Sequence, residues 1–583
     1  MTTAKLAAAH LRLIVILLAV ASAATPPAQA EALLAWKASL GDPEALSTCT
    51  NATPICTGWR GIAATRAAAS RRSASEAFGL NGKLGALNLS ALPALVKLDL
   101  SGHILGGAIP HQLAELRRMS HLDLGDNYLT NPSSELTPMP SLRFVSLCLN
   151  DLNGSFPVFV RGSGNITYLD LSLNAFSGPI PGALPEKIRY LNLSGNTFSG
   201  RIPASLAGLT KLRELRLGAN NLTGGLPDFL GSMSQLQVLE LGDNLLGGQL
   251  PPTLGQLRRL RHLDLTSTGL LSTVPPELGN LTKLNFIDLS INRLTGALPA
   301  SLSGMQSMRE FGVSSNSLAG EIPGDLFANW TKLVSFQAHM NWLSGKIPTE
   351  VAKATKLKVL SLFSNNLGGR IPSEIGNMSA LQRLDINTNQ LEGELPTTIS
   401  SLRNLQYLAL FDNNLTGTIP PDLGEGLAMV EVTFGNNAFF GELPQNLCNG
   451  LMLQNFSAHN NNFSGRLPPC LKNCTKLYRV WLEGNHFTGD ISEAFGVHPS
   501  LVYLDISRNE LTGRLSDDWG KCLNISFLHM DDNYISDSIP TTFGNMVNLQ
   551  DLSLAKNSLT GAIVPYLGGL DVLFNLNLSG NFL

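Results

Sequence analysis

The chain has 583 residues, of which 44% are hydrophobic and 15% charged, a balance that excludes a disordered chain and favours a folded one. Its formal net charge of −3 excludes a general electrostatic attraction to nucleic acid or to an acidic membrane surface. The 55 glycines and 32 prolines recur at fixed offsets instead of filling one linker, which indicates turns built into a repeat.

Residues 1–30 have the features of a secretory signal peptide. Lys5 and Arg12 supply positive charge, residues 13–24 are an apolar stretch, and Ala28-Gln29-Ala30 offers a small-residue cleavage site. An apolar run of twelve residues is too short to cross a bilayer, which needs about 20, and no later run is longer. The sequence therefore predicts an exported chain, secreted or at the cell surface, with no membrane segment of its own.

Seven cysteines are present, and export makes disulfides their expected state. Cys448 could pair with either Cys470 or Cys474, and a zinc site there is disfavoured because no fourth ligand lies nearby. Cys522 lies two repeats beyond Cys474, about 10 Å away, which is too far for a disulfide. Cys148 is expected to be free.

From Leu212 onward the chain repeats itself every 24 residues, with a single spacing of 25, and less regular repeats start at Leu95, Met119, Leu142, Ile166 and Ile188. Twenty complete repeats precede a fragment that starts at Leu573. In the repeat over 405–428, alternating apolar residues predict a short strand, and the rest predicts a short helical or irregular return. The ninth residue, Asn413, recurs as Asn in most repeats and predicts a ladder of buried amides that satisfies backbone groups at the bend. His103 and Thr268 replace this Asn, which predicts looser packing in two repeats.

One repeat cannot bury its own leucines, but stacked repeats can cover one another. We therefore expect an α/β repeat solenoid whose strands form a parallel sheet on the concave face and whose returns form the convex face.

The repeats over 381–404 and 405–428 follow L-x-x-L-x-L-S-x-N-x-L-[ST]-G-x-I-P-x-x-[LI]-G-x-[LM]-x-x, which resembles the plant-specific leucine-rich repeat. Residues 31–40 together with Trp59-Arg60-Gly61-Ile62 resemble the N-terminal cap of plant leucine-rich-repeat receptor-like kinases. The resemblance implies a signal peptide over 1–30, a cap over 31–94, and about twenty repeats of a plant-type superhelix over 95–583, the last one truncated.

For function, the resemblance implies a receptor ectodomain that binds an extracellular peptide or protein and signals through a kinase or a leucine-rich-repeat co-receptor kinase. Full-length relatives carry a transmembrane helix and a serine/threonine kinase domain, but this sequence has no H-R-D, D-F-G or V-A-I-K motif. We therefore expect no enzymatic activity.

Two details depart from the family pattern. The cap usually has two cysteines around its Trp-Arg-Gly stretch; Cys56 fits the first, but Ala63-Ala64 stands where the second is expected, which leaves Cys49 as the alternative partner of Cys56. No strand carries an Arg-x-Arg pair of the kind that some such receptors use to hold a peptide carboxylate.

Large side chains gather on the outward strand positions from Leu333 onward, where earlier repeats have mostly Ser or Gly. Aromatic and arginine side chains dominate binding hot spots. Five strand steps, about 24 Å, separate the ends of this stripe, and an extended peptide covers that distance in about seven residues. The alternative is that the rings pack on one another and stiffen the sheet. The predicted ligand-binding residues are His339, Phe363, Arg383, Tyr407, Phe411, Arg479 and Trp481.

Fifteen N-x-S/T sequons predict glycosylation. Asn192, Asn455 and Asn577 fall on concave positions, but no sequon falls on an outward strand position between Leu333 and Glu431, which leaves that part of the stripe open. The predicted sites are Asn51, Asn88, Asn153, Asn165, Asn192, Asn221, Asn280, Asn329, Asn377, Asn414, Asn455, Asn462, Asn473, Asn524 and Asn577.

The sequence shows no catalytic set, no cofactor motif and no metal-ligand motif. The strand aspartates share one repeat position and are expected to be solvated, and His262, His459 and His529 are expected to be surface polar residues. A receptor ectodomain is the favoured function. The alternative is a soluble inhibitor of a foreign hydrolase such as polygalacturonase, or a secreted decoy.

Overall fold

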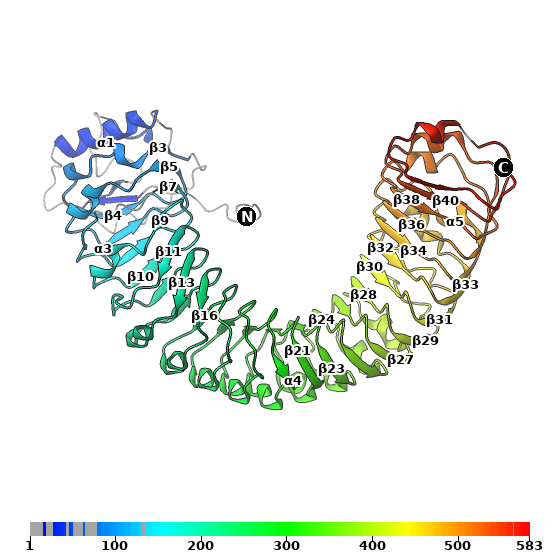
Figure 1. Ribbon diagram of the computed structural model, residues 1–583, viewed down its shortest axis with the longest axis horizontal. Helices are drawn as coiled ribbons and strands as arrows, with labels where there is room; N and C mark the ends of the chain where they lie inside the picture. The colour runs from blue at the N-terminus through cyan, green and yellow to red at the C-terminus, as the bar shows by residue number, and fades with distance from the viewer. Residues whose placement is uncertain are drawn as a thin grey trace. The chain divides into compact units, whose positions relative to one another are not determined.

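A computed structural model describes residues 15–18, 27–41, 43, 46–50, 62–63, 79–130, 136–563 and 565–583. The chain divides into two compact units, Met1–Asn292 and Arg293–Leu583, which are called the N-terminal and C-terminal units. Each unit contains a long parallel sheet to which every repeat contributes one short strand (Figure 1).

In the N-terminal unit the sheet strands follow one another in chain order and pair in parallel, with residues at equal repeat positions opposite each other. The strands are β4 (Leu95–Asp99), β6 (His121–Asp123), β8 (Phe144–Ser146), β10 (Tyr168–Asp170), β12 (Tyr190–Asn192), β14 (Glu214–Arg216), β16 (Val238–Glu240), β17 (His262–Asp264) and β18 (Phe286–Asp288).

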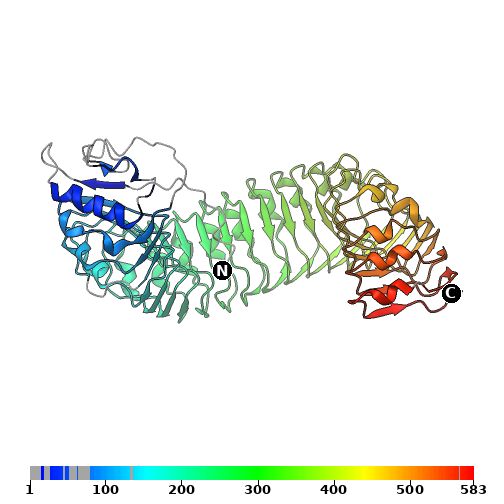
Figure 2. The same ribbon diagram turned by 90° about the horizontal axis from the view of Figure 1, so that it is seen from above.

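The C-terminal unit has the same arrangement, and Figure 2 shows its turns stacked strand beside strand. Its sheet strands are β20 (Glu310–Gly312), β22 (Ser335–Gln337), β24 (Val359–Ser361), β26 (Arg383–Asp385), β28 (Tyr407–Ala409), β30 (Glu431–Thr433), β32 (Asn455–Ser457), β34 (Arg479–Trp481), β36 (Tyr503–Asp505), β38 (Phe527–His529), β40 (Asp551–Ser553) and β42 (Asn575–Asn577).

A second set of strands follows the bend in most repeats and forms smaller parallel sheets. In the N-terminal unit these are β3 (Asn81–Lys83), β5 (Ile104–Gly107), β7 (Tyr128–Leu129), β9 (Asn153–Gly154), β11 (Ala175–Pro179), β13 (Thr197–Arg201) and β15 (Asn221–Thr223). In the C-terminal unit they are β19 (Thr295–Gly296), β21 (Ser317–Glu321), β23 (Trp342–Gly345), β25 (Asn366–Gly369), β27 (Gln390–Glu394), β29 (Asn414–Gly417), β31 (Ala438–Gly441), β33 (Asn462–Arg466), β35 (His486–Asp490), β37 (Glu510–Thr512), β39 (Ser536–Asp537) and β41 (Ser558–Leu559).

The returns are mostly single turns of 3-10 helix that begin after a proline, whose fixed φ suits the residue before a helix. They are η3 (Leu84–Ala86), η4 (Leu89–Ala91), η5 (His111–Glu115), η6 (Ala204–Gly208), η7 (Asp228–Ser232), η8 (Pro252–Gln256), η9 (Pro276–Asn280), η10 (Ala300–Gly304), η11 (Thr349–Lys353), η12 (Ser373–Asn377), η13 (Thr397–Ser401), η14 (Pro469–Asn473), η15 (Trp519–Lys521), η16 (Thr541–Asn545) and η17 (Pro565–Gly569). Short α-helices replace them at α3 (Val158–Gly162), α4 (Gly324–Asn329) and α5 (Ile491–Ala494).

The predicted asparagine ladder is present in both units. The Nδ2 group of Asn365 donates to the carbonyls of Leu362, Phe363 and, one repeat earlier, Ala338, at 3.0, 3.3 and 3.0 Å. Its Oδ1 accepts the backbone N–H of Leu343 at 3.0 Å. One buried amide therefore provides hydrogen-bond partners for the backbone groups at the bend of its own repeat and links that repeat to the one before.

At the substituted ladder position Thr268 is fully buried, and its hydroxyl donates to the Leu265 carbonyl at 2.8 Å. Asn292 of the next repeat compensates, because its Oδ1 accepts the backbone N–H of both Thr268 and Leu270. The expected loosening of this repeat stays a prediction, but its polar groups have partners.

The residue before the ladder asparagine adopts a left-handed conformation that the sequence pattern did not predict. φ is +52° at Ser364 and +54° at Asp412, and the same position has a positive φ in most repeats, whatever its side chain. This conformation costs a non-glycine residue on the order of 1 kcal/mol, so the ladder bonds on either side must outweigh that strain.

The N-terminal region contributes helix α1 (Pro27–Ser39), drawn in blue in Figure 1. This helix contacts η4 and buries Trp36 and Leu33. Strand β1 (Val15–Leu18) pairs antiparallel with β4 and parallel with β2 (Ile62–Ala63). Helix α1 spans the expected cleavage point after residue 30. The boundaries of the signal peptide and of the cap stay predictions. Cys56 and Asn51 lie outside the described residues.

Candidate ligand-binding face

On the outward face of the C-terminal unit, the side chains at the third, fifth and seventh positions of each repeat form three rows that run from strand to strand. Parallel register places Arg383 opposite Tyr407, and Arg479 opposite Tyr503. Because neighbouring strands lie about 4.8 Å apart, residues of one row are close enough to stack. The seven residues predicted to bind a ligand all lie in these rows.

The first group joins His339 to Phe363. Their rings stack with centroids 4.3 Å apart and 12° between planes. The imidazole Nδ1 also lies 2.9 Å from the Ser314 hydroxyl and 3.2 Å from the Ser361 hydroxyl. Both rings are half-buried, so each keeps an exposed edge in a fixed position.

The second group joins Arg383 to Tyr407, with the guanidinium carbon 4.0 Å from the ring centroid. Both side chains are half-buried. Next to them, burial raises the pKa of Asp385 to about 6, although the charge of Arg383 opposes the shift. The stack fixes the arginine and still leaves its charge available to a ligand.

Phe411 lies on the same row as Phe363, two strands further on and about 10 Å away. Between them stands Asn387, which is buried and donates a short hydrogen bond to Asp385. The structure thus places two half-buried phenyl rings on either side of a buried amide.

The third group contains Trp481 and Arg479. The indole stacks on His459 with centroids 3.7 Å apart, and its Nε1 donates to Glu483 at 2.7 Å. Arg479 is exposed and lies over the Tyr503 ring at 4.7 Å. The expected alternative to ligand binding therefore describes these contacts correctly, because the rings do pack on one another along the sheet.

Leucine-rich-repeat family models match the chain at residues 210–270, 187–209, 356–378, 380–402, 404–425, 452–474 and 500–522. The solved ectodomain of the Arabidopsis receptor kinase HAESA, in complex with an N-terminally extended IDA peptide hormone, is 31% identical with a TM-score of 0.78. That match covers 95% of this chain and 85% of the HAESA chain. The chain belongs to the plant leucine-rich-repeat receptor family.

A second solved structure, of Arabidopsis HAESA with the peptide hormone IDA and the co-receptor SERK1, is 28% identical with a TM-score of 0.76, and the match covers 95% of this chain and 94% of that one. Receptor-like protein 41 of Arabidopsis thaliana is 36% identical over 95 residues, which are 16% of this chain and 10% of that protein. The match thus spans about a tenth of the length of this curated relative. No helix within the described residues is both long and apolar enough to cross a membrane.

Two expectations about this leucine-rich-repeat receptor chain were wrong. The strand aspartates were expected to be solvated, but Asp170 and Asp505 are buried. Each accepts the backbone N–H two residues ahead, at 3.0 Å from Ser172 and from Ser507, so this position closes a turn at the strand end. His459 was expected to be a surface residue, but it is 5% exposed, because its ring fits above Gly435.

A ladder of rings in the N-terminal unit was missed from the sequence. His121, Phe144, Tyr168 and Tyr190 stack in series at 4.1, 4.3 and 4.2 Å, with planes within 8° of parallel. Their common place as third residue of four successive repeats was the available signal.

A disulfide joins Cys448 to Cys470. Of the two partners left open for Cys448, the structure takes the first, and Cys474 remains a buried thiol whose pKa burial raises to about 11. Cys49, Cys148 and Cys522 form no disulfide within the part of the chain that the structure describes, and Cys56, the expected partner of Cys49, lies outside that part. The bond links the returns of two adjacent repeats.

Most of the predicted glycosylation sites are exposed, and Asn280, Asn377 and Asn473 each end a 3-10 helix on the returns. Asn192 and Asn455 lie on the strand-lined face and are half-buried. Their amide nitrogens donate to Asp170 and Glu431, each at 3.3 Å, so a glycan there would disturb an existing contact.

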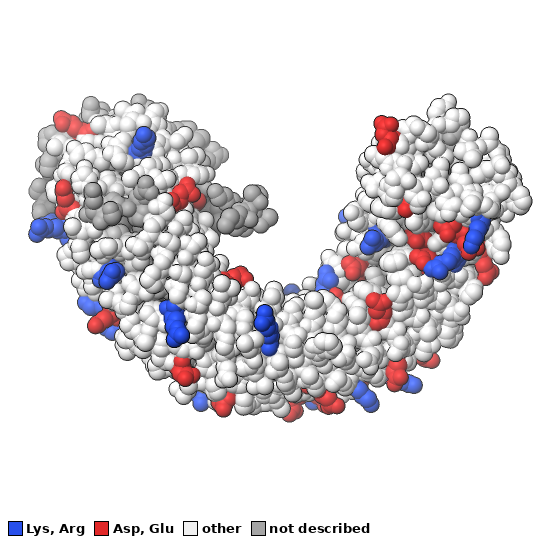
Figure 3. Space-filling view, viewed as in Figure 1, with Lys and Arg blue, Asp and Glu red and all other residues white. Residues whose placement is uncertain are grey.

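Charge is mixed on the face that Figure 3 shows. Neither sign forms a large continuous patch there, and acidic and basic side chains stand together over the C-terminal unit. In the C-terminal unit, Arg466 and Glu493 pair at 2.9 Å. Such a surface suits selective contacts better than general attraction to a polyanion.

Proposed function

We propose that this chain is the extracellular ligand-binding part of a plant receptor, and that an extended peptide or protein segment lies across β24–β34. The observation that carries the proposal is the pair of rings, Phe363 and Phe411, that flank the buried Asn387. An apolar ligand side chain fits between two rings about 10 Å apart, because it can contact both faces at once.

The stacked contacts support this function as well as stability. His339 fixes Phe363, and Tyr407 fixes Arg383, so neither side chain has much rotamer freedom left to lose when a ligand binds. The Arg383 charge, close to Asp385, gives the ligand polar contacts beside the apolar ones. No sequon falls on an outward strand position between Leu333 and Glu431, so a glycan does not cover Phe363 or Phe411, although Asn455 on β32 lies further along the same face.

The partners in this proposal are a peptide or protein ligand and a leucine-rich-repeat co-receptor kinase. The solved complex of HAESA with IDA and SERK1 supports both kinds of partner. We further propose that the chain is exported with its signal peptide removed and glycans attached. N-terminal sequencing of the secreted protein should then begin at Glu31, and peptide mapping should find modified sequons.

The binding face can be tested without knowing the natural ligand. The probe is a displayed library of random linear peptides, selected on the wild-type chain. The double variant Phe363→Ala/Phe411→Ala should weaken binding of the selected peptides about tenfold or more, since both anchors are lost.

The matched control is Phe144→Ala/Phe286→Ala. Both of these phenylalanines are strand-face rings that stack on a histidine at 4.1 Å, but they lie in the other unit. The control should bind the selected peptides within about twofold of the wild-type chain. Retention of affinity within a factor of about two in the Phe363/Phe411 variant would show that the proposed face is wrong.

A further inference from the structure

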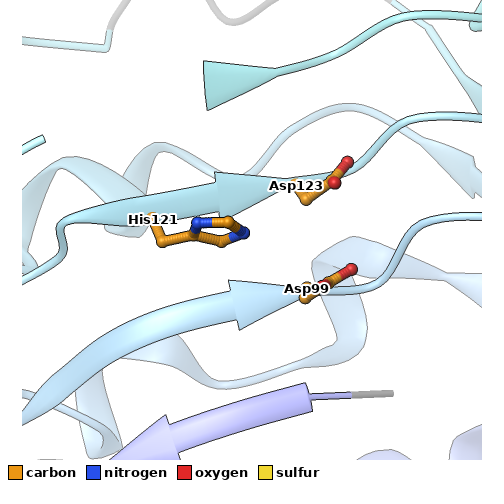
Figure 4. Close-up of side chains that lie close together, drawn as sticks. All are labelled: Asp99, His121 and Asp123. Atoms are coloured by element: carbon orange, nitrogen blue, oxygen red, sulfur yellow. The ribbon is translucent and has the colours of Figure 1, made fainter. Parts of the chain in front are cut away.

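Three metal-ligating side chains converge on the strand-lined face of the N-terminal unit. A ring nitrogen of His121 and one carboxylate oxygen each of Asp99 and Asp123 all lie within 4.8 Å of one another. His121 and Asp123 are two residues apart on β6 and so share a face, and Asp99 is opposite Asp123 on β4. Figure 4 shows the imidazole extending along β6 toward the two carboxylates.

Each carboxylate uses only part of its capacity within the fold. Asp99 Oδ1 accepts the Ser101 hydroxyl at 2.9 Å, and Asp123 Oδ1 accepts the Gly125 N–H at 3.1 Å. These bonds hold the carboxylates in place at the strand ends. Asp99 Oδ2 lies 3.1 Å from the ammonium of Lys97, whose long side chain can swing into solvent.

His121 lacks a hydrogen-bond partner for one ring nitrogen, and this points to a ligand. Its Nε2 is buried and has no hydrogen-bond partner among the described residues. Its ring is held by the stack on Phe144, so the nitrogen cannot turn away without breaking that contact. A buried polar atom without a partner is uncommon in folded proteins and calls for an explanation.

The same chain contains a second His-Leu-Asp strand with a different outcome. On β17, His262 also stacks on a phenylalanine, Phe286, at 4.1 Å. There, however, Nε2 lies 3.2 Å from a carboxylate oxygen of Glu240, which itself pairs with Arg216. The tripeptide alone therefore does not create the arrangement; the neighbouring aspartate on β4 does.

A third cluster, around His529, also differs. Its two ring nitrogens face two different carboxylates, Asp505 at 3.7 Å and Asp551 at 3.0 Å. The ring is thus placed between the acids as a bridging cation. At His121 the two aspartates lie together instead, so one ion can reach both of them and the ring.

From this geometry we propose that Asp99, His121 and Asp123 form a binding site for a divalent transition-metal ion of the zinc class. One imidazole and two carboxylates are a ligand set that zinc accepts, with water or a bound ligand at the remaining position. Ligand atoms around zinc lie roughly 3.4 Å apart, so the three side chains must close by about an ångström. Lys97 would leave Asp99 as the ion enters. The site goes beyond the proposed peptide-binding function and lies in the other unit.

The test uses the full chain, freed of metal by a chelator, and titrates zinc chloride by calorimetry. His121→Phe is the main variant, because it removes the nitrogen while extending the existing stack of Phe144, Tyr168 and Tyr190. Zinc affinity should fall about tenfold or more in this variant. Asp123→Asn, whose amide oxygen can still accept the Gly125 N–H, should have a similar effect.

The matched control is His262→Phe, which makes the same change in the same tripeptide and should leave zinc affinity within about twofold. Lys97→Met removes the competing ammonium and should tighten zinc binding, and magnesium should give no comparable heat because imidazole does not favour it. Equal zinc binding by the wild-type chain and His121→Phe, with both folded, would overturn the proposal. So would an equal loss in His262→Phe.

Discussion

The imidazole of His459 lies flat against the indole of Trp481, with ring centroids 3.7 Å apart and only 6° between the planes. His459 can take this position because the preceding strand carries Gly435 at the equivalent place. A Cβ built on Gly435 would lie 2.2 Å from His459 Cε1, well inside contact distance. A glycine without special backbone geometry therefore sets the position of two rings on the strand-lined face.

Gly435→Ala should accordingly destabilise the C-terminal unit by about 1–3 kcal/mol, because the added methyl group displaces a packed ring. The measurement is the urea midpoint of unfolding, together with the loss of the His459–Trp481 contact in the aromatic chemical shifts. Gly208→Ala is the control, since a Cβ there meets nothing within 4 Å. An unchanged midpoint in Gly435→Ala would mean that His459 relaxes freely and that the stack is not fixed by this glycine.

The asparagine ladder gives a second prediction. Asn365→Ala removes donors to three carbonyls and the acceptor for Leu343, and leaves those buried groups without partners. The cost should be about 1–3 kcal/mol or somewhat more, as several groups are affected at once. Asn366→Ala, one residue on and outside the ladder, should change stability far less. Urea unfolding of the two variants decides between them, and similar midpoints would contradict the ladder's role.

The repeat, the strand and the asparagine ladder could be predicted from the sequence because each recurs once in every 24 residues. Leu405, Leu408 and Leu410 alternate with outward residues, and all three are buried as expected. The left-handed residue before Asn413 could not be predicted in the same way. Asp412 fills that position here and Ser364 in another repeat, so no residue type marks it. The conformation follows from the bonds on either side of it.

The candidate site was only partly predictable for a related reason. The sequence places Phe363 and Phe411 on one row. Contacts between rows depend on side-chain rotamers, which the repeat spacing does not determine. The stack of His459 on Trp481 crosses from the seventh position of one repeat to the fifth of the next. The choice of Cys470 over Cys474 as partner for Cys448 likewise depends on the orientation of two returns.

The disulfide gives a third prediction. Cys448 and Cys470 close a loop with a sequence separation of 22, so their loss should cost roughly 3 kcal/mol through the greater freedom of the unfolded chain. The double variant Cys448→Ser/Cys470→Ser should therefore lower the urea midpoint. Cys474→Ser, at a buried free thiol, tests whether Cys474 can replace Cys470 as the partner of Cys448. Mass mapping after alkylation of the native protein should leave Cys474 unmodified until denaturant is added. A native Cys448–Cys474 peptide would contradict the pairing.

His529 gives the last prediction, a dependence of stability on pH. The Asp505 carboxylate, 3.7 Å from Nδ1, is the main cause that raises the pKa of His529 to about 9, and burial opposes it. Burial alone would raise the pKa of Asp505, but its contact with His529 and its hydrogen bonds from Ser507 lower it overall. Because the folded-state pKa of the histidine lies above its unfolded value of about 6.5, its contribution is fully present below pH 6.5 and is lost as pH rises through 9.

His529→Gln should therefore be much less stable than the wild-type chain at pH 6, and the difference should shrink by pH 10, where the wild-type ring has lost its proton. The measurement is the difference in urea midpoint between the two chains across this range. His111→Gln, at an exposed histidine, is the control and should show no such trend. A difference that stays constant from pH 6 to pH 10 would mean that His529 stabilises the sheet by packing alone, without its charge between Asp505 and Asp551.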